Sequence, residues 1–243
     1  MTAQTLVLLH GVGLERTVWE PVTALLGGRF RIVAPDLPGH GSRPPVPEGT
    51  TLGDLAAGVA GEIPPGAHVV GFSLGALVAQ HLAVHRPELV ATLTSVSSVC
   101  RRTEAERAAV LKRLATAEAD PRASTAASLH RWFDGTNVSA DRIRATEATL
   151  EANDPASFAR CYRVFATADA EIGPRLGEIR APALAVTGEL DPGSTPEMTR
   201  RLAEAVPDCT AEVIPGARHM LPVQNPRELV TCLTAFIGRC SHV

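Results

Sequence analysis

Short, continuous apolar runs recur along the chain, and segments with helical periodicity lie between them. The runs are rich in leucine and β-branched residues and are bounded by Gly, Pro or Asp, which predicts strands buried on both faces. The six predicted strands span Thr5–His10, Phe30–Asp36, His68–Ser73, Leu89–Ser98, Ala183–Leu190 and Thr210–Pro215. The predicted helices span Val18–Leu26, Leu52–Glu62, Leu74–His85, Pro196–Val206 and Pro226–Ile237. This alternation predicts an α/β fold: a mostly parallel sheet with right-handed crossovers and helices on both faces.

The interval from residue 100 to about residue 177 interrupts the alternation, because it contains helical patterns but no convincing strand. It holds five of the nine aromatic side chains of the chain: Trp132, Phe133, Phe158, Tyr162 and Phe165. An aromatic-rich helical insertion suits a cap over a ligand cleft, since apolar walls bury substrate surface. The alternative is a plain extra helical layer whose aromatics form core. We expect one domain, with a core of residues 1–99 and 178–243 and a helical cap of about 100–177.

Composition and charge exclude several classes of function. The chain has 23 basic and 26 acidic side chains without long blocks of one sign, and its net charge is −3. We therefore expect neither nucleic acid nor an anionic membrane as a partner. The five cysteines lie far apart, without metal-ligand spacing, the amino-terminal apolar run is too short for a signal peptide, and no run approaches a membrane-spanning length. These features predict a cytoplasmic protein and leave the oligomeric state open.

One serine lies between two glycines in the stretch Gly71-Phe72-Ser73-Leu74-Gly75, where a predicted strand meets a predicted helix. This is the G-x-S-x-G form of a nucleophile elbow, in which a strained serine projects from the carboxyl edge of the sheet. Glycines two residues to either side let strand and helix cross closely. The alternative is a small residue in a tight turn, but the strand-turn-helix setting favours Ser73 as a nucleophile.

A serine hydroxyl is a weak nucleophile at neutral pH, so this hypothesis requires a base and a group that orients the base. His219 lies in the loop after the last predicted strand, and Asp191 follows the strand before it. Both loops are expected at the edge that carries Ser73, and the order Ser, Asp, His is the one expected for a triad on this topology. Asp191 could instead be a turn aspartate and His219 a loop histidine. Glu189 competes with Asp191, but it should lie within or barely beyond the strand.

A tetrahedral oxyanion also requires hydrogen-bond donors. The backbone N–H of Leu74 is one candidate, and the N–H of Val12, in the HGVG stretch after the first strand, is the other. HGVG is not a dinucleotide fingerprint, because Arg16 stands where G-x-G-x-x-G requires its third glycine. The chain has no P-loop pattern either.

Two further features carry weaker signals. His81 and His85 are four residues apart on one predicted helix and could share a metal, but the sequence lacks the Glu of H-E-x-x-H and offers no third ligand. We therefore predict solvated or packed histidines and no metal site. The turn-rich loop from Ala34 to Ser42 is expected to border the cleft, although a structural turn would have the same composition.

Taken in order, the motifs HGVG, PDLPGHG, GFSLG, TGELDP and PGARHM resemble those of the α/β-hydrolase superfamily along almost the whole chain. Within it, the segments Leu129–Phe133 and Asn153–Cys161 and the stretch TGELDPGSTPEM are most similar to 3-oxoadipate enol-lactonases and related small esterases. This resemblance implies that Arg131 and Trp132 bind a free carboxylate of the substrate. The alternative is an arginine that runs along a cap helix beside a core tryptophan. HGVG and Ala76 depart from the lactonase pattern.

The residues and the resemblance together predict a serine hydrolase that cleaves a small carboxylic ester or lactone through an acyl-enzyme, without a metal or an organic cofactor. The substrate could be an enol-lactone that bears a carboxylate. Three alternatives stay open from the sequence: acyl transfer or carbon–carbon bond hydrolysis on the same triad, cofactor-free oxygen or perhydrolase chemistry, and a non-catalytic small-molecule binding protein.

Overall fold

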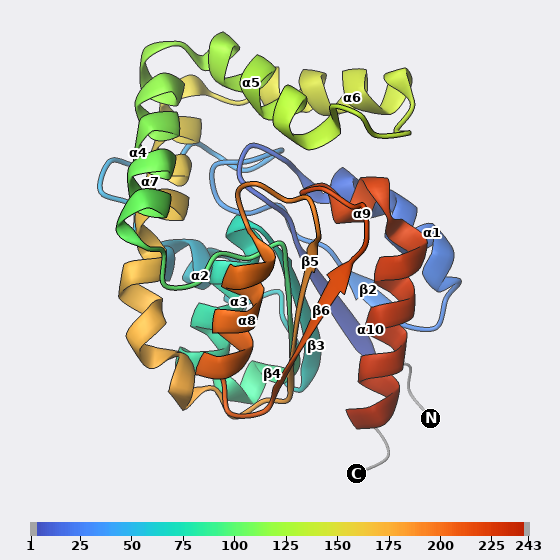
Figure 1. The fold of residues 1–243 in the computed structure, drawn as a ribbon. Coiled ribbons are helices and arrows are strands. Elements are labelled where there is room, and N and C mark those ends of the chain that lie inside the picture. Colours follow the sequence, from blue (N-terminus) through green and yellow to red (C-terminus); the bar gives the residue numbers. More distant parts are fainter. Residues whose placement is uncertain (1–3, 241–243) are drawn as a thin grey trace.

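A six-stranded parallel sheet runs through the computed structural model, which describes residues 4–240. The strands are β1 (Thr5–Leu9), β2 (Arg31–Val33), β3 (Ala67–Phe72), β4 (Val90–Val96), β5 (Ala183–Gly188) and β6 (Cys209–Ile214). They lie in the order β2-β1-β3-β4-β5-β6, and every neighbouring pair is parallel (Figure 1). The carboxyl ends of all six strands therefore meet at one edge of the sheet.

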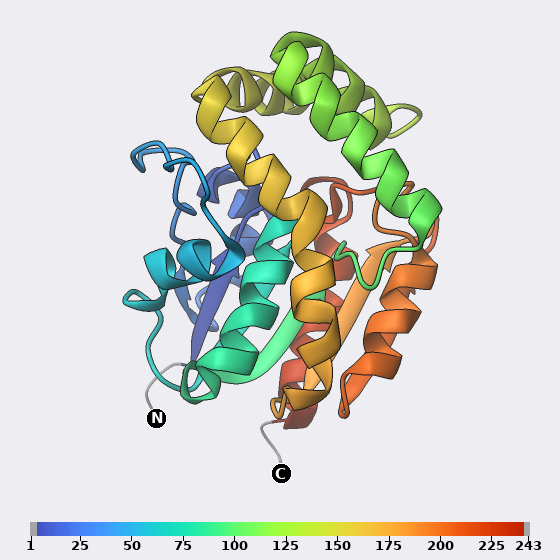
Figure 2. The same ribbon diagram turned by 90° about the vertical axis from the view of Figure 1, so that its left-hand side faces the viewer.

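Helices cover both faces of this sheet. They are α1 (Glu20–Leu26), α2 (Leu52–Ala60), α3 (Leu74–His85), α8 (Pro196–Ala205), α9 (Leu221–Gln224) and α10 (Pro226–Cys240), with 3-10 turns η1 (Arg16–Trp19), η2 (Pro87–Leu89) and η3 (Gly173–Glu178). Successive side chains of a strand point to opposite faces. In β1, Val7 and Leu9 join the core under α2, α3 and α8, whereas Leu6 and Leu8 join the core under α1 and α10 (Figures 1 and 2). The predicted α/β architecture is confirmed.

The two edge strands differ from the prediction of strands buried on both faces. β2 has three residues, of which Arg31 and Ile32 are exposed, and β6 exposes Thr210, Ala211 and Glu212. An edge strand has a neighbour on one side only, so its side chains are less completely covered. The apolar character of a short run does not encode its place in the sheet, and the prediction therefore failed at these two positions.

Four helices connect β4 to β5, and in the described structure no strand lies between them: α4 (Glu104–Ala119), α5 (Pro121–Phe133), α6 (Ala140–Glu151) and α7 (Pro155–Ile172). We refer to them as the cap helices. Each begins after a side chain that accepts a hydrogen bond from a first-turn N–H, namely Thr103, Asp120, Ser139 or Asp154. α5 and α6 lie above the carboxyl ends of the strands, whereas α4 packs along α7, and α7 continues beside α3 on one face of the sheet (Figures 1 and 2). No helix within residues 4–240 combines the length and the apolar character needed to cross a membrane.

Candidate active site

Ser73 lies in the turn between β3 and α3, with backbone angles φ 55° and ψ −111°. Positive φ is costly for any residue that has a Cβ atom, so this turn is strained. Two backbone hydrogen bonds hold it: the Ser73 N–H donates to Val96 O at 2.9 Å, and the Ala76 N–H donates to Ser73 O at 3.0 Å. The strand-turn-helix setting expected from the G-x-S-x-G pattern is present, including the strained serine.

The two glycines of the pattern are required by close backbone approaches. A Cβ atom on Gly71 would lie 2.1 Å from the carbonyl oxygen of Gly75, and one on Gly75 would lie 2.3 Å from that of Leu9. Neither position can hold a larger residue unless the backbone moves. β3 and α3 therefore cross closely enough to present Ser73 at the carboxyl edge of the sheet.

His219 and Asp191 form a buried pair at the same edge. Asp191 follows β5 and His219 follows β6, and His219 Nδ1 lies 2.7 Å from Asp191 Oδ2. Asp191 Oδ1 also accepts hydrogen bonds from the N–H groups of Gly193 and Ser194, both at 2.9 Å. A carboxylate can only accept, so Nδ1 of the neutral imidazole carries the proton and Nε2 is left with its lone pair. This is the tautomer that can act as a base.

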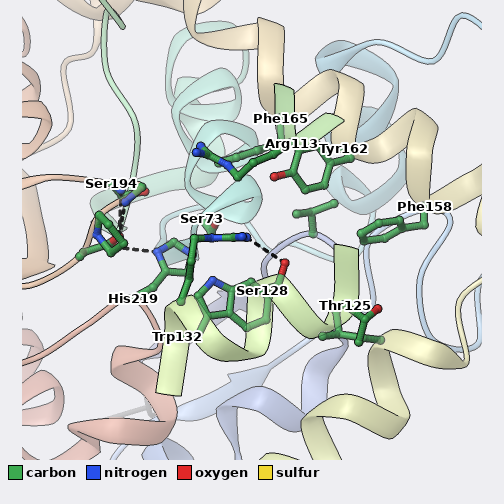
Figure 3. A pocket seen from close by; sticks show the side chains of 16 residues that line it. Ser73, Arg113, Thr125, Ser128, Trp132, Phe158, Tyr162, Phe165, Ser194 and His219 are labelled. Atoms are coloured by element: carbon green, nitrogen blue, oxygen red, sulfur yellow. Dashed lines mark hydrogen bonds and ion pairs between the residues drawn. The ribbon is translucent and has the colours of Figure 1, made fainter. Parts of the chain in front are cut away.

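The His219 ring is packed between two aromatic side chains. Its centroid lies 5.1 Å from that of Phe72, the residue before Ser73, and 5.8 Å from that of Trp132, with which it stacks at 21°. The Ser97 hydroxyl donates to the His219 carbonyl at 3.0 Å. These contacts fix the imidazole beside the Ser73 turn (Figure 3). The Ser73 hydroxyl faces the same cleft and has no hydrogen-bond partner within residues 4–240.

Glu189, the competing acid, lies elsewhere. It directly follows the last residue of β5, and its Oε2 accepts a hydrogen bond from the Gly216 N–H at 2.8 Å. The structure therefore brings Asp191, and not Glu189, to the histidine.

The HGVG loop is held by its buried histidine. His10 Nδ1 lies 2.8 Å from Gly11 O, and the Leu37 N–H donates to His10 Nε2 at 2.8 Å. Burial lowers the pKa of His10 to about 3, so the ring is neutral, with Nδ1 as donor and Nε2 as acceptor. Val12 lines the cleft, and its N–H has no partner in the described part of the chain. The N–H of Leu74, the first residue of α3, has no acceptor within the helix.

A cleft lies between the carboxyl edge of the sheet and the cap helices. Its described lining residues are Val12, Ser73, Arg113, Thr125, Ser128, Arg131, Trp132, Leu150, Phe158, Tyr162, Phe165, Asp191, Pro192, Gly193, Ser194 and His219 (Figure 3). Four of the five aromatics expected in the cap thus face the cleft, whereas Phe133 packs into a hydrophobic core. The walls of the cleft are mostly apolar, as in sites that bind small organic ligands.

Arg131 and Trp132 both reach this cleft from the carboxyl end of α5. Trp132 covers the His219 ring, and the Arg131 guanidinium donates to Ala127 O at 3.0 Å and to Ser128 Oγ at 2.9 Å. Both acceptors are neutral, and no carboxylate of the described chain pairs with Arg131. The guanidinium is therefore available to an anionic ligand.

Sequence reasoning missed four polar residues of the cleft: Arg113, Thr125, Ser128 and Ser194. Arg113 lies on α4, in an alanine-rich and charged segment. Basic residues recur there every few positions, so the sequence does not indicate which of them faces the cleft. Ser194 follows Asp191 by three residues, and its buried hydroxyl has no partner in the described structure. No local pattern distinguishes any of the four, because helix rotation and loop packing decide which side chains face a cleft.

The expectation that the loop from Ala34 to Ser42 borders the cleft is wrong. None of residues 34–42 lines the cleft; instead Asp36 accepts hydrogen bonds from the backbone N–H groups of Arg16, at 2.9 Å, and Ser42, at 3.4 Å. The loop therefore supports the HGVG stretch structurally.

The histidine pair of α3 has a cationic neighbour. His81 and His85 stack with ring centroids 4.1 Å apart, and the Arg175 guanidinium lies 2.9 Å from His85 Nε2. This positive charge opposes the binding of a metal cation there. Across residues 4–240, no three His, Cys, Asp or Glu side chains are grouped to hold a metal ion.

Comparisons with known proteins identify the family of the chain. The profile of the alpha/beta hydrolase family matches residues 6–231. The (E)-2-((N-methylformamido)methylene)succinate hydrolase of Acinetobacter baylyi is 30% identical over 239 residues, which cover 96% of this chain and 90% of that protein. The pimeloyl-[acyl-carrier protein] methyl ester esterase of Aeromonas salmonicida is 30% identical over 242 residues, covering 96% and 95% of the two chains.

The resemblance to enol-lactonases is also confirmed. The 3-oxoadipate enol-lactonase 1 of Acinetobacter baylyi is 28% identical over 243 residues, covering 97% of this chain and 89% of that protein. The crystal structure of the enol-lactonase from Burkholderia xenovorans superposes with a TM-score of 0.83 at 23% identity, covering 98% of this chain and 92% of that one. At this identity the structural likeness establishes the fold.

Proposed function

The chain belongs to the alpha/beta hydrolase family, and from this premise we propose that it hydrolyses a small carboxylic ester or lactone with Ser73 as the nucleophile. Its relatives are hydrolases, esterases and lactonases, so the coarse reaction class comes from the family. The finer assignment rests on the residues of the cleft.

The observation that carries the proposal is the buried Asp191–His219 hydrogen bond of 2.7 Å, which opens onto the same cleft as the strained Ser73. This bond orients the imidazole with Nε2 free, and the Asp191 carboxylate stabilises the cation that forms when Nε2 takes a proton. A non-catalytic binding protein would have no need for a strained serine beside an oriented base.

The proposed reaction proceeds in two halves. His219 Nε2 takes the proton of the Ser73 hydroxyl as Oγ attacks the carbonyl carbon, and the N–H groups of Val12 and Leu74 stabilise the resulting oxyanion. The intermediate collapses, the leaving oxygen takes the proton from His219, and an acyl-enzyme on Ser73 results. His219 then deprotonates a water molecule that attacks the acyl carbon, and the acid is released with Ser73 regenerated. With a lactone, the leaving oxygen stays attached to the product.

The substrate is proposed to carry a carboxylate that binds Arg131. Two relatives act on a succinate derivative and on a 3-oxoadipate enol-lactone, both of which carry carboxylates. The Arg131 guanidinium is partly buried, lines the cleft and has only neutral partners among the described residues. A carboxylate is the ligand that matches the two parallel N–H groups of a guanidinium.

Replacement of Ser73 by alanine tests the reaction. Ser73→Ala is expected to lower kcat for a short ester by at least about 1000-fold. Without the Ser73 hydroxyl no acyl-enzyme can form, and the base and the oxyanion donors accelerate hydrolysis only slightly by themselves. An activated phosphonate ester should add to the peptide that contains Ser73, as measured by mass spectrometry, and should leave the variant unmodified. Assays with and without an added alcohol distinguish hydrolysis from acyl transfer.

The matched control is Ser124→Ala, because Ser124 is a buried serine of α5 outside the lining of the cleft. This variant should keep the wild-type rate. A Ser73→Ala protein that is folded by circular dichroism and hydrolyses the ester at the wild-type rate would remove Ser73 from the mechanism.

A further inference from the structure

The cleft above Ser73 contains two guanidinium groups and a single carboxylate. Its charged or histidine side chains, within the described lining, are Arg113, Arg131, Asp191 and His219. Both oxygens of Asp191 are already occupied, Oδ2 by His219 and Oδ1 by two backbone N–H groups. The Asp191 carboxylate is therefore fully engaged by His219 and backbone N–H groups. Within the described lining, neither Arg113 nor Arg131 forms an ion pair with it.

Arg131 is held in place by neutral groups. Its two hydrogen bonds go to Ala127 O and Ser128 Oγ, both within one turn of its own helix. Burial lowers the pKa of its guanidinium and the nearby charge of Arg113 acts in the same direction, whereas Tyr162 and Asp191 act in the opposite direction. The net shift is downward, so an anion bound beside the guanidinium would stabilise its positive charge.

Arg113 is half-buried on α4 and has no hydrogen bond or ion pair within residues 4–240. Figure 3 shows it beside Tyr162 and Phe165, on the cap side of the cleft. The acidic residues of α4 that do form ion pairs are committed to other arginines, Glu106 to Arg201 and Glu118 to Arg163. No side chain of its own helix neutralises Arg113.

Resting on the ester or lactone hydrolysis proposed above, we propose that Arg113 and Arg131 form two separate anion-binding positions in the cleft. The substrate is accordingly an ester or lactone with two free carboxylates, one for each guanidinium. The reacting carbonyl lies at Ser73, below both positions, so neither carboxylate takes part in the bond changes.

Electrostatics favours this assignment over two arginines that merely extend to solvent. Two unpaired like charges that line one cleft repel each other, and folded proteins rarely keep partly buried charges without partners. Arg113 and Arg131 come from different cap helices, α4 and α5, and converge on one cleft. Two bound carboxylates would neutralise both charges.

The test compares three methyl esters that differ in the number of free carboxylates. Methyl butanoate has none, monomethyl succinate has one, and the 1-methyl ester of propane-1,2,3-tricarboxylate has two. The wild-type kcat/KM, followed by acid release, is expected to rise by about tenfold or more with each carboxylate, because each adds a charge-assisted hydrogen bond. A wild-type enzyme that does not prefer the doubly charged ester overturns the inference.

Three variants assign the effect to residues. Arg113→Gln should lose about tenfold or more in kcat/KM on the doubly charged ester alone, mainly through KM, whereas Arg131→Gln should lose on both charged esters. Lys112→Gln is the matched control, because it removes one positive charge from the adjacent, exposed position of α4. Its three rates should stay within about twofold of wild type. An equal loss on all three esters in Arg113→Gln would mean a structural role and overturn the inference.

Binding separates this inference from the proposed reaction. In the Ser73→Ala background, glutarate should bind about tenfold more weakly after Arg113→Gln, whereas butanoate should be unaffected, as measured by calorimetry. This readout stands even if none of the esters is hydrolysed, an outcome that would reject the reaction and not the anion positions. Glutarate affinity unchanged by Arg113→Gln would reject the second position, whatever the activity.

Discussion

Ser73, the proposed nucleophile, has a strained backbone conformation. Its φ of 55° lies in a region that glycine adopts freely and that costs a residue with a Cβ atom about 1–3 kcal/mol. The surrounding structure offsets this cost: Gly71 allows β3 and α3 to approach, Gly75 allows α3 to approach the end of β1, and the Val96 carbonyl accepts a hydrogen bond from the Ser73 N–H. The same turn directs the side chain to the cleft, so the strain and the proposed reactivity have one cause.

This strain predicts an inverse relation between stability and side-chain size at residue 73. Ser73→Gly should be more stable than Ser73→Ala by about 1 kcal/mol, since only glycine relaxes at this φ. Urea unfolding of the two inactive proteins measures the difference. The control pair is Ser124→Gly and Ser124→Ala, at the fourth residue of helix α5, where the N–H already donates to Asp120 O and the glycine should be the less stable by up to about 1 kcal/mol. The same sign at both positions would contradict the assignment of strain.

The cap helices are anchored to the sheet by a buried ion pair. Arg102, in the segment between β4 and α4, bonds through Nη1 to Asp169 Oδ1 of α7 at 2.6 Å, and its own N–H donates to Oδ2 at 2.9 Å. Both side chains are only 1% exposed, and Arg102 also lies over the Phe165 ring. Because Phe165 lines the cleft, this pair ties the position of the cleft wall to the end of β4.

Asp169→Asn is expected to destabilise the protein by about 3–5 kcal/mol, because it leaves the Arg102 charge buried without its counterion. The measurement is the free energy of unfolding in urea. Asp141→Asn is the control, since Asp141 and its partner Arg144 are 88% and 67% exposed, and a loss below about 1 kcal/mol is expected there. Comparable losses in the two variants would show that burial of the first pair has no special effect.

The molecule buries two neutral histidines, His10 within the HGVG loop and His40 beside it, and this makes its stability depend on pH. The rings of His10 and His40 lie 5.1 Å apart, and burial lowers their pKa values to about 3 and about 4. In the unfolded chain both titrate near pH 6.5. The unfolded state therefore binds more protons below that pH, so the stability present above pH 6.5 is lost as the pH falls toward 4.

Each of these histidines should contribute a slope of up to about 1.4 kcal/mol per pH unit to the free energy of unfolding between pH 6 and pH 4.5. His68 and His81, whose pKa values burial also lowers, add to the total slope. His40→Asn should therefore reduce the slope without removing it, as measured by urea unfolding at a series of pH values. His130→Asn, at an exposed position, should leave it unchanged. An unaltered slope in His40→Asn would exclude a contribution from this histidine.

Much of the fold and part of the candidate site follow from local sequence. Continuous apolar runs and helical periods are local properties, and the six strands and five sheet helices they predicted all occur, with ends shifted by a few residues. Gly71 and Gly75 flank Ser73 because the turn excludes Cβ atoms there, and this requirement is visible in the sequence itself. The order of the three proposed triad residues also follows from the topology, since parallel strands end at one edge.

The alternation of strands and helices, and the three loops that carry Ser73, Asp191 and His219, thus follow from local sequence. Three other features depend on the folded chain: Asp191 and not Glu189 reaches His219, β2 and β6 are exposed edges, and Arg113 lies in the cleft. The difference lies in the separation, along the chain, of the residues that interact. Backbone conformation responds to neighbouring residues, whereas these pairings depend on strand order, helix rotation and contacts between residues far apart in the chain.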